Sequence, residues 1–404
     1  MTPRSPEPTA SRASRVCFVQ TLALLIAGVA PLPAGWTWAR SALDSARSTH
    51  LSKADLERGG GGYYEGLIGH GEDLQANNTG LARRLTGAAV DQGRFRAANV
   101  VRQLPDTDFL QFELKPDVNV RLFGHDFSTN QHGMRDRYHP VEKPEDVYRI
   151  ALLGSSIDMG WGVGDDATYA DLLEGWLNAQ AAARSSGRRF EVLNFAVAAY
   201  GPLHRLETYR AKARGFAPDL VLFSATMLDT RLMELHLGDV FRSRGPLPYG
   251  FLRDAVNQAG LTAADVAVTP DGRLVDKDRF KSKLRPRYWS IYDAALGTLA
   301  ADCRGDGVEL IALAVPRVGK ADSPGSREPT LARLKGIAAH HAIPLYDLTA
   351  TFDGIDPTTL EIAPWDDHPN VQGHRRLFLA LTRAWLADPA MMARLFPSEG
   401  NDQP

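Results

Sequence analysis

The stretch VYRIALLGSSIDMGWGV, residues 147–163, decides the fold. Its apolar run ends at Gly154, as is typical of a strand buried on both faces of a parallel sheet. Ser156 follows at once, and Gly160 bounds the turn behind it. A turn of this kind lifts a serine hydroxyl out of the sheet for nucleophilic attack, and the N–H groups after it can hold an oxyanion. Taken alone, the same serine would also suit a helix cap, so a second element is needed.

That second element is WDDHPNVQGH, residues 365–374. His368 has Asp366 two residues before it, and we expect both between the last strand and the last helix. An imidazole there can take a proton from a serine, while the carboxylate fixes its tautomer and stabilises the imidazolium. The two segments together predict a serine nucleophile with a histidine base.

Between these segments, apolar runs alternate with stretches of helical spacing. This alternation predicts a parallel sheet with helices on both faces, and catalytic groups at the carboxyl ends of its strands. The predicted fold is therefore a three-layer α/β/α sandwich, flavodoxin-like, with an N-terminal extension and an insertion. The predicted strands are 148–154, 190–197, 219–225, 308–315 and 344–348; the predicted helices are 169–183, 203–214, 288–301, 330–340 and 371–386.

The remaining segments divide the chain. Residues 231–285 interrupt the alternation with turn signals, and we interpret them as an insertion near the site and a candidate lid. Residues 110–122 alternate apolar and polar positions on either side of Lys115-Pro116-Asp117, which predicts a β-hairpin. The predicted regions are 1–47, a signal or anchor with linker; 48–145, an accessory region; and 146–390, the main domain.

The N-terminus predicts export. Residues 1–15 are polar and carry three arginines, and residues 16–30 read VCFVQTLALLIAGVA. A positive flank before an apolar stretch is an export signal pattern. Extended to Trp36, the stretch reaches about 20 residues, enough to cross a hydrocarbon core of about 30 Å, so a cleaved signal and a membrane anchor both remain open. Either places the body in the periplasm or cell envelope.

Composition excludes several classes of function. Lys and Arg number 46 against 48 Asp and Glu, a balance that does not indicate nucleic acid as a partner. The two cysteines, Cys17 and Cys303, make neither a disulfide framework nor a cysteine zinc site. No glycine-rich phosphate loop and no metal-ligand spacing occurs, so we predict no cofactor and no metal. His340 and His341 are predicted to be surface residues at a helix end.

These segments resemble the SGNH (GDSL-type) hydrolase superfamily over roughly residues 146–388. The family's first block, Gly-Asp-Ser-x-x-x-Gly, corresponds to Gly154-Ser155-Ser156 and Gly160, with Ser155 in place of the aspartate, which makes Ser156 the nucleophile. The last block is Asp-x-x-His-Pro-Asn, or Asp-x-His, and matches at His368-Pro369-Asn370. In the pattern Asp-x-x-His the aspartate would stand three residues before His368, but that residue is Trp365. Asp366 is therefore the predicted acid and Asp367 the second candidate.

The resemblance is weaker in the oxyanion hole. The second block, Asn-x-Gly-x-x-Gly, reads NFAVAAY here, and Ala199 stands at its last glycine, keeping the N–H but tolerating fewer backbone angles. The third block, Asn-Asp, reads Leu228-Asp229, so a side-chain donor is missing, which typically costs about 10²–10³ in rate. We predict oxyanion or substrate contacts from the N–H groups of Ser156 and Ala199 and from Gly160. A hydroxyl from Ser224 or Thr226 is a candidate replacement.

The resemblance implies a serine ester hydrolase that acts on O-acyl groups of carbohydrates or lipids. Two alternatives stay open: an O-acetyltransferase of an envelope polysaccharide, which uses the same serine chemistry, and a non-catalytic glycan-binding or assembly protein that keeps the fold. The segment NQHGMRD, residues 130–136, also resembles an Asn-x-x-Gly-Phe-Arg segment found before the first block in many exported bacterial members.

Overall fold

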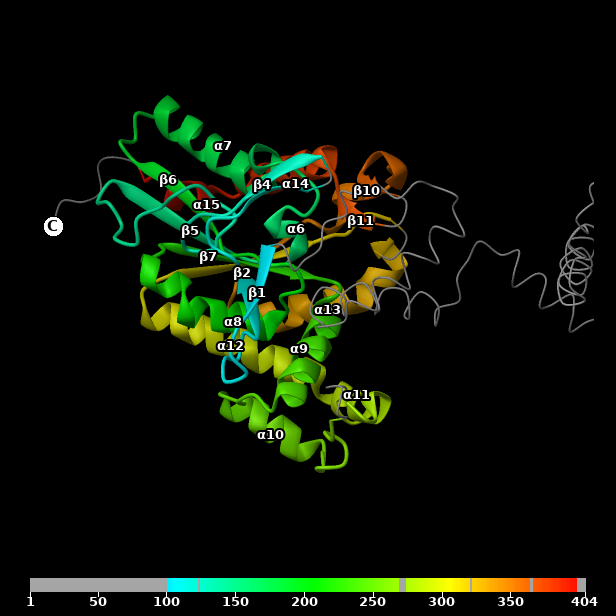
Figure 1. Cartoon of the computed structure of the whole chain (residues 1–404). Helices are drawn as coiled ribbons and strands as arrows, with labels where there is room; N and C mark the ends of the chain where they lie inside the picture. Colours follow the sequence, from blue (N-terminus) through cyan, green and yellow to red (C-terminus); the bar gives the residue numbers. More distant parts are fainter. Residues whose placement is uncertain (1–99, 123, 269–273, 320–321, 364–365, 398–404) are drawn as a thin grey trace, which may run out of the picture. The chain divides into compact units, whose positions relative to one another are not determined.

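The computed structural model describes residues 100–122, 124–268, 274–319, 322–363 and 366–397 (Figure 1). These all belong to one unit of the chain, Tyr64–Pro404. The predictions for residues 1–47, and the first half of the predicted accessory region, lie outside the described residues. Within the described part, no helix is both long enough and apolar enough to cross a membrane.

A five-stranded parallel sheet forms the centre of this unit, with the strand order β6-β5-β7-β8-β9. Ile150 of β5 lies opposite Val192 of β6, and Leu152 of β5 lies opposite Leu222 of β7. The chain order thus reverses at β5, and ligands of open α/β sheets bind beyond the carboxyl ends of the strands at such a reversal. The strands are β5 (Val147–Leu153), β6 (Arg189–Asn194), β7 (Leu220–Thr226), β8 (Glu309–Val315) and β9 (Leu345–Asp347).

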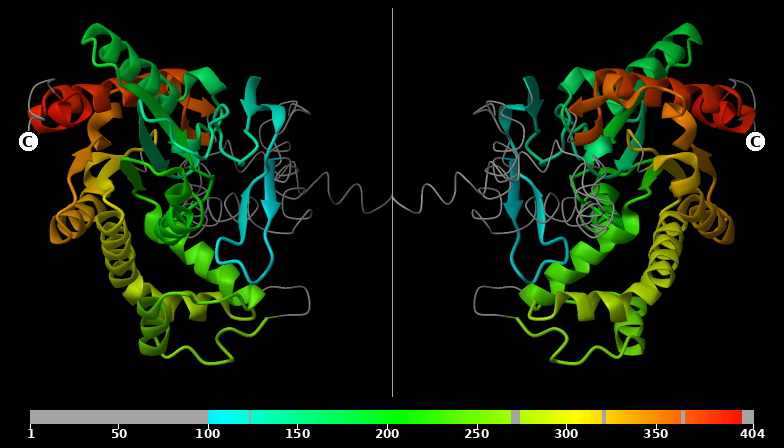
Figure 2. Two further views of the ribbon diagram at one scale, coloured as in Figure 1. Left: turned by 90° about the vertical axis from the view of Figure 1, so that its left-hand side faces the viewer. Right: turned by 90° about the vertical axis from the view of Figure 1, so that its right-hand side faces the viewer.

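Helices cover both faces of the sheet because its side chains alternate between two apolar cores. Ile150 and Leu152 pack with helices α7 and α14, whereas Ala151 and Leu153 pack with α8, α12 and α13. Figure 2 shows α14 and α15, in red, on the opposite side of the sheet from α12, in yellow. This confirms the predicted α/β/α sandwich. The helices are α7 (Tyr169–Ala183), α8 (Pro202–Ala211), α12 (Tyr288–Gly305), α13 (Pro324–His340), α14 (Val371–Leu386) and α15 (Pro389–Leu395).

The described part of the insertion is largely helical, and its interpretation as a lid stays a prediction. It contains most of α9 (Asp229–Ser243) together with α10 (Gly250–Gln258) and α11 (Lys277–Leu284). Helix α9 packs on α8 and α12, and α10 packs on α12. Because Leu252 of α10 and Phe280 of α11 join the same core as Ala151, these helices extend one layer of the sandwich.

The predicted hairpin across residues 110–122 is wrong, since its two halves belong to different hairpins. Strand β2 (Phe112–Leu114) pairs with β1 (Val101–Gln103), and β3 (Asn119–Leu122) pairs with β4 (His125–Ser128). Alternation of apolar residues reports which face of a strand is buried and not which strand lies beside it.

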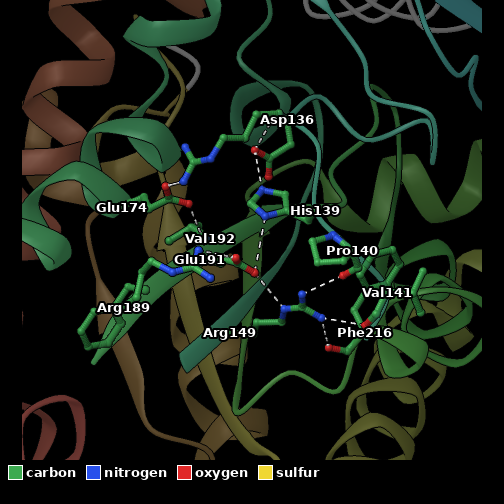
Figure 3. A network of polar contacts seen from close by, with 12 residues as sticks. Asp136, His139, Pro140, Val141, Arg149, Glu174, Arg189, Glu191, Val192 and Phe216 are labelled. Carbon is green, nitrogen blue, oxygen red and sulfur yellow. Dashed lines mark hydrogen bonds and ion pairs between the residues drawn. The ribbon is translucent and has the colours of Figure 1, made fainter. Parts of the chain in front are cut away.

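A buried polar network closes the amino end of the sheet (Figure 3). Arg149 of β5 is completely buried, and its Nε donates to Glu191 of β6 at 2.9 Å. Its other N–H groups donate to the carbonyls of Pro140, Val141 and Phe216 at 2.7–2.8 Å. Burial raises the pKa of Glu191, but hydrogen bonds from Arg149 and Arg189 outweigh it and hold that pKa below its usual value. The network fastens the segment before β5 to the sheet.

Candidate active site

The nucleophile turn lies directly after β5, at the carboxyl end of the sheet. Helix α6 (Ser156–Met159) begins at Ser156 and ends at Gly160, whose φ of 82° is left-handed. The Gly160 N–H donates to the carbonyl of Ile157 at 2.9 Å. Gly160 therefore terminates this helix, and its amide is engaged there; the predicted oxyanion or substrate contact at Gly160 stays a prediction.

The structure brings Ser156, His368 and Asp366 together. The Nε2 of His368 lies 2.7 Å from Ser156 Oγ, although 212 residues separate them in the chain. The Nδ1 of His368 lies 2.5 Å from Asp366 Oδ1. Both residues belong to β11 (Asp366–Pro369), which pairs antiparallel with β10 (Glu361–Ala363). All three side chains are buried, and Ser156 is 5% exposed.

The geometry separates the two candidate acids. Asp366 accepts a second hydrogen bond, from Trp161 Nε1 at 3.0 Å, whereas Asp367 pairs with Arg317 at 2.7 Å. Burial raises the pKa of Asp366, but the nearby His368 and the bonds from His368 and Trp161 outweigh this and lower it. An ionised Asp366 accepts the Nδ1 proton, which leaves Nε2 of His368 to accept from the serine hydroxyl.

Ala199 lies in the loop after β6 with a φ of 68°, in the left-handed region that favours glycine. It is 1% exposed and packs in one apolar cluster with Met159 and Trp161, at the end of the nucleophile turn. Within the described residues, its N–H has no acceptor among the hydrogen bonds of the structure. The loop therefore holds a backbone conformation that favours glycine while carrying a methyl group.

Leu228 stands where the sequence resemblance calls for an asparagine. Leu228 directly precedes α9 and packs in the apolar cluster that contains Ala199. The two hydroxyls considered as replacements are already engaged with buried carboxylates. Ser224 donates to Asp158 at 2.6 Å, and Thr226 donates to Asp229 at 3.0 Å. The suggestion that one of them supplies an oxyanion proton is therefore corrected.

Asp158 is a site residue that the sequence analysis missed. Its completely buried carboxylate accepts from the Ser155 N–H at 2.7 Å, from Tyr169 at 2.5 Å and from Ser224. Gly154 is required beside it, since a Cβ there would lie 2.2 Å from Asp158 Oδ2. Burial raises the pKa of this carboxyl. The pattern Ser155-x-x-Asp158, which resembles a capping box, is the sequence signal that would have found it.

Arg135 is a second missed residue, and it comes from the accessory region. It is 4% exposed, and its Nη1 donates to the carbonyls of Met159, at 2.8 Å, and Gly160. Its Nη2 donates to the carbonyl of Val163 at 2.5 Å, and its Nε donates to Asp165 at 3.1 Å. Arg135 thus holds the segment that follows the nucleophile. The resemblance of residues 130–136 to a family segment was the signal, but it gave this arginine no role.

Solved structures similar to this chain match it remotely. TesA is 14% identical, with a TM-score of 0.37 over 61% of this chain and 99% of TesA. An acetylxylan esterase from Geobacillus stearothermophilus, Axe2, is 17% identical, with a TM-score of 0.37 over 58% of this chain and 93% of its own. A two-domain esterase active on acetylated mannans is 13% identical, with a TM-score of 0.37 over 65% of this chain and 52% of its own.

No family model and no curated protein matches the sequence. Fold and site together define an α/β/α protein with a serine–histidine–aspartate arrangement at the carboxyl edge of its sheet. The assignment of function rests on that arrangement and on the sequence motifs.

Proposed function

We propose that the chain is a serine ester hydrolase of the SGNH type, with Ser156 as nucleophile, His368 as base and Asp366 as the orienting acid. One observation carries the proposal: an unbroken hydrogen-bond chain from Asp366 through His368 to the Ser156 hydroxyl, with contacts of 2.5 and 2.7 Å. A serine hydroxyl is a weak nucleophile until an adjacent base accepts its proton, and this chain supplies that base in the correct tautomer.

The reaction follows from these contacts. Ser156 Oγ attacks the ester carbonyl as its proton passes to His368 Nε2, and Asp366 stabilises the imidazolium. The N–H groups of Ser156, at the start of α6, and of Ala199 stabilise the oxyanion of the tetrahedral intermediate. The imidazolium then protonates the leaving alcohol, and an acyl group remains on Ser156. Water, deprotonated by His368, releases the acid and restores the serine.

The missing amide at Leu228 sets an expectation for rate. Loss of one oxyanion donor typically costs about 10²–10³ in kcat. The proposed enzyme therefore turns over simple esters slowly.

The proposed substrates are O-acyl esters of carbohydrates or lipids in the cell envelope. This substrate class follows from the sequence resemblance together with the proposed export signal in residues 1–47, which would also provide contact with the membrane if it is retained. Cell fractionation tests the location: the chain should be found in the periplasm or in the inner-membrane fraction, and recovery in the cytoplasm would contradict it.

The test of the activity compares the full chain with Ser156→Ala on a short-chain chromogenic ester and with a fluorophosphonate probe. We expect the wild type to hydrolyse the ester and to carry the phosphonyl group on the peptide containing Ser156. The variant should do neither while it keeps the same melting temperature. Equal turnover and equal labelling of both proteins would contradict the proposal.

O-acetyl transfer to an envelope polysaccharide is a second candidate, favoured by the burial of Ser156 and His368, which are 5% and 2% exposed and so shielded from bulk water. A rise in acyl-donor consumption when a glycan acceptor is added would support transfer over hydrolysis. A non-catalytic glycan-binding role is favoured by the missing amide at Leu228. It predicts that Ser156→Ala leaves glycan affinity intact and that neither protein shows turnover.

A further inference from the structure

Two consecutive histidines and one aspartate meet where helices α12 and α13 pack together. Asp293 lies in α12, His340 is the last residue of α13, and His341 is its C-cap. The Oδ1 of Asp293 lies 3.2 Å from His340 Nδ1 and 2.8 Å from His341 Nε2. The three atoms all lie within 4.8 Å of one another. These residues take no part in the proposed ester hydrolysis.

Two of the three separations are close to those between zinc ligands. Zn²⁺ binds histidine nitrogen and carboxylate oxygen at about 2.0–2.1 Å, so two ligands at a tetrahedral angle lie about 3.3 Å apart. The two nitrogen-to-oxygen distances, 3.2 and 2.8 Å, are within about 0.5 Å of that separation. The three ligand atoms are therefore near enough to share one ion once the hydrogen bonds to Asp293 give way to bonds to the metal.

The surroundings favour a cation and fix one ligand in place. Both histidines stand at the C-terminal end of α13, and a helix C-terminus carries a partial negative charge. The ring of His341 lies against the backbone of Gly297, where a Cβ would come within 2.4 Å of the ring. His341 is therefore seated in a space that only glycine leaves open, and its nitrogen is held towards Asp293.

The cluster is also open enough to load and to coordinate a further ligand. The side chain of His340 is 68% exposed, that of Asp293 37% and that of His341 19%. A shallow groove of about 350 Å³ adjoins it, lined among others by Trp289 and Arg333. Arg333 lies over the Trp289 ring and stands two turns before His340 on α13, about 10 Å along the helix.

We propose that Asp293, His340 and His341 bind one Zn²⁺ ion, with water in the remaining position of a tetrahedral site. Three protein ligands and an open position are typical of a zinc site that exchanges with solvent. The sequence analysis found no metal-ligand spacing because 47 residues separate Asp293 from His340.

Equilibrium dialysis of the chelator-treated full chain against ZnCl₂ measures the site directly. We expect one Zn²⁺ per chain at this site, and a Co²⁺ titration should show the intense visible absorption of a tetrahedral complex. Loss of a group that merely supports a ligand costs roughly 10–100-fold in metal affinity, so His341→Ala and Asp293→Asn, which remove ligands, should each weaken binding at least ~100-fold. His125→Ala, at an exposed histidine of β4, is the matched control and should bind as the wild type does.

Gly297→Ala provides a variant that removes no ligand. Its methyl group would displace the His341 ring, so we expect weaker zinc binding although the helix gains a better helix former. Circular dichroism verifies that each variant folds. Unchanged zinc affinity in His341→Ala and Asp293→Asn would overturn the proposal. So would binding that is lost in His368→Ala and retained in His341→Ala, because the second histidine–aspartate cluster of the described residues lies at Asp366, Asp367 and His368.

Discussion

Two histidine–aspartate pairs in this molecule have similar contacts and very different surroundings. His368 and Asp366 meet at 2.5 Å, with their side chains 3% and 5% exposed. His341 and Asp293 meet at 2.8 Å, with their side chains 19% and 37% exposed. In the first pair, the other ring nitrogen of His368 lies against the Ser156 hydroxyl, whereas in the second pair the Asp293 oxygen also contacts the imidazole of His340.

The difference shows that burial, more than contact distance, determines what such a pair can do. In a low-dielectric site each hydrogen bond is stronger than in water, and a polar group without a hydrogen-bond partner is costly. The buried pair therefore holds one tautomer and one geometry. At the surface the same contact is worth about 0–1 kcal/mol, and a solvent molecule or an ion can replace it. The predictions below test this contrast at four places.

The largest effect is expected for Asp366→Asn. An asparagine there keeps the size of the side chain but favours the wrong tautomer of His368, so kcat for ester hydrolysis should fall by about 10⁴. Asp367→Asn, one residue away and paired with Arg317 instead, should leave kcat within a factor of about three of the wild type. Steady-state kinetics of the two variants decides the point, and equal losses in both would contradict the assignment of the acid.

The arrangement of Ser156, His368 and Asp366 was predictable from sequence because its signals are local. Ser156 follows an apolar run within one turn, and His368 has its acid two residues before it. The sheet was predictable for the same reason, since each strand carries its own apolar run. Arg135 was not predictable in this way. Its partners lie 24–30 residues further along the chain, and most of them are backbone carbonyls, which every residue carries whatever its side chain.

The errors have a related cause. The alternation in residues 110–122 shows the buried faces of β2 and β3 correctly but says nothing about partners, which are β1 and β4. The insertion was interpreted from its turn residues, whereas the apolar face of α9 buries Leu232, Met233 and Leu237. The convergence of Asp293 with His340 depends on how two helices pack, which no local pattern encodes.

The second largest effect is expected for Arg135→Met. This removes a buried guanidinium that donates to three carbonyls and to the partly exposed Asp165. A buried acceptor left without its partner typically costs about 1–3 kcal/mol, so we expect a loss of about 3 kcal/mol. Arg121→Met is the exposed counterpart, because Arg121 and Asp126 are 75% and 78% exposed. It should change the free energy of unfolding by less than about 1 kcal/mol. Urea unfolding of both variants tests the contrast, which fails if the two losses are alike.

A third expectation concerns acid stability. Burial lowers the pKa of His236 to about 4 and that of His374 to about 3, both below the value of 6.5 for a free histidine. The unfolded chain therefore binds protons that the folded chain does not, and stability falls as the pH drops from about 6.5 towards 4. Each such histidine lowers the free energy of unfolding by up to roughly 1.4 kcal/mol for every pH unit of acidification in this range.

Urea unfolding between pH 7.5 and 4.5 measures that slope. His236→Phe should reduce it, whatever the variant does to stability at pH 7.5. Leu386→Ala, which shortens an exposed apolar side chain of α14 and removes no titratable group, should leave it unchanged. An identical slope in the wild type and in His236→Phe would show that His236 does not titrate as its burial implies.

The smallest effect is expected for Ala199→Gly, which tests the strained loop beside the nucleophile. A left-handed backbone costs an alanine roughly 1–2 kcal/mol, whereas glycine loses roughly 0.5–1 kcal/mol of chain entropy on folding. These terms nearly cancel, so the free energy of unfolding should rise by less than about 1 kcal/mol. The N–H is present in both residues, and kcat should stay within a factor of about three. A tenfold fall in kcat would mean that the methyl group, and not only the amide, positions the substrate. A tenfold rise would mean that the alanine holds the amide away from the oxyanion.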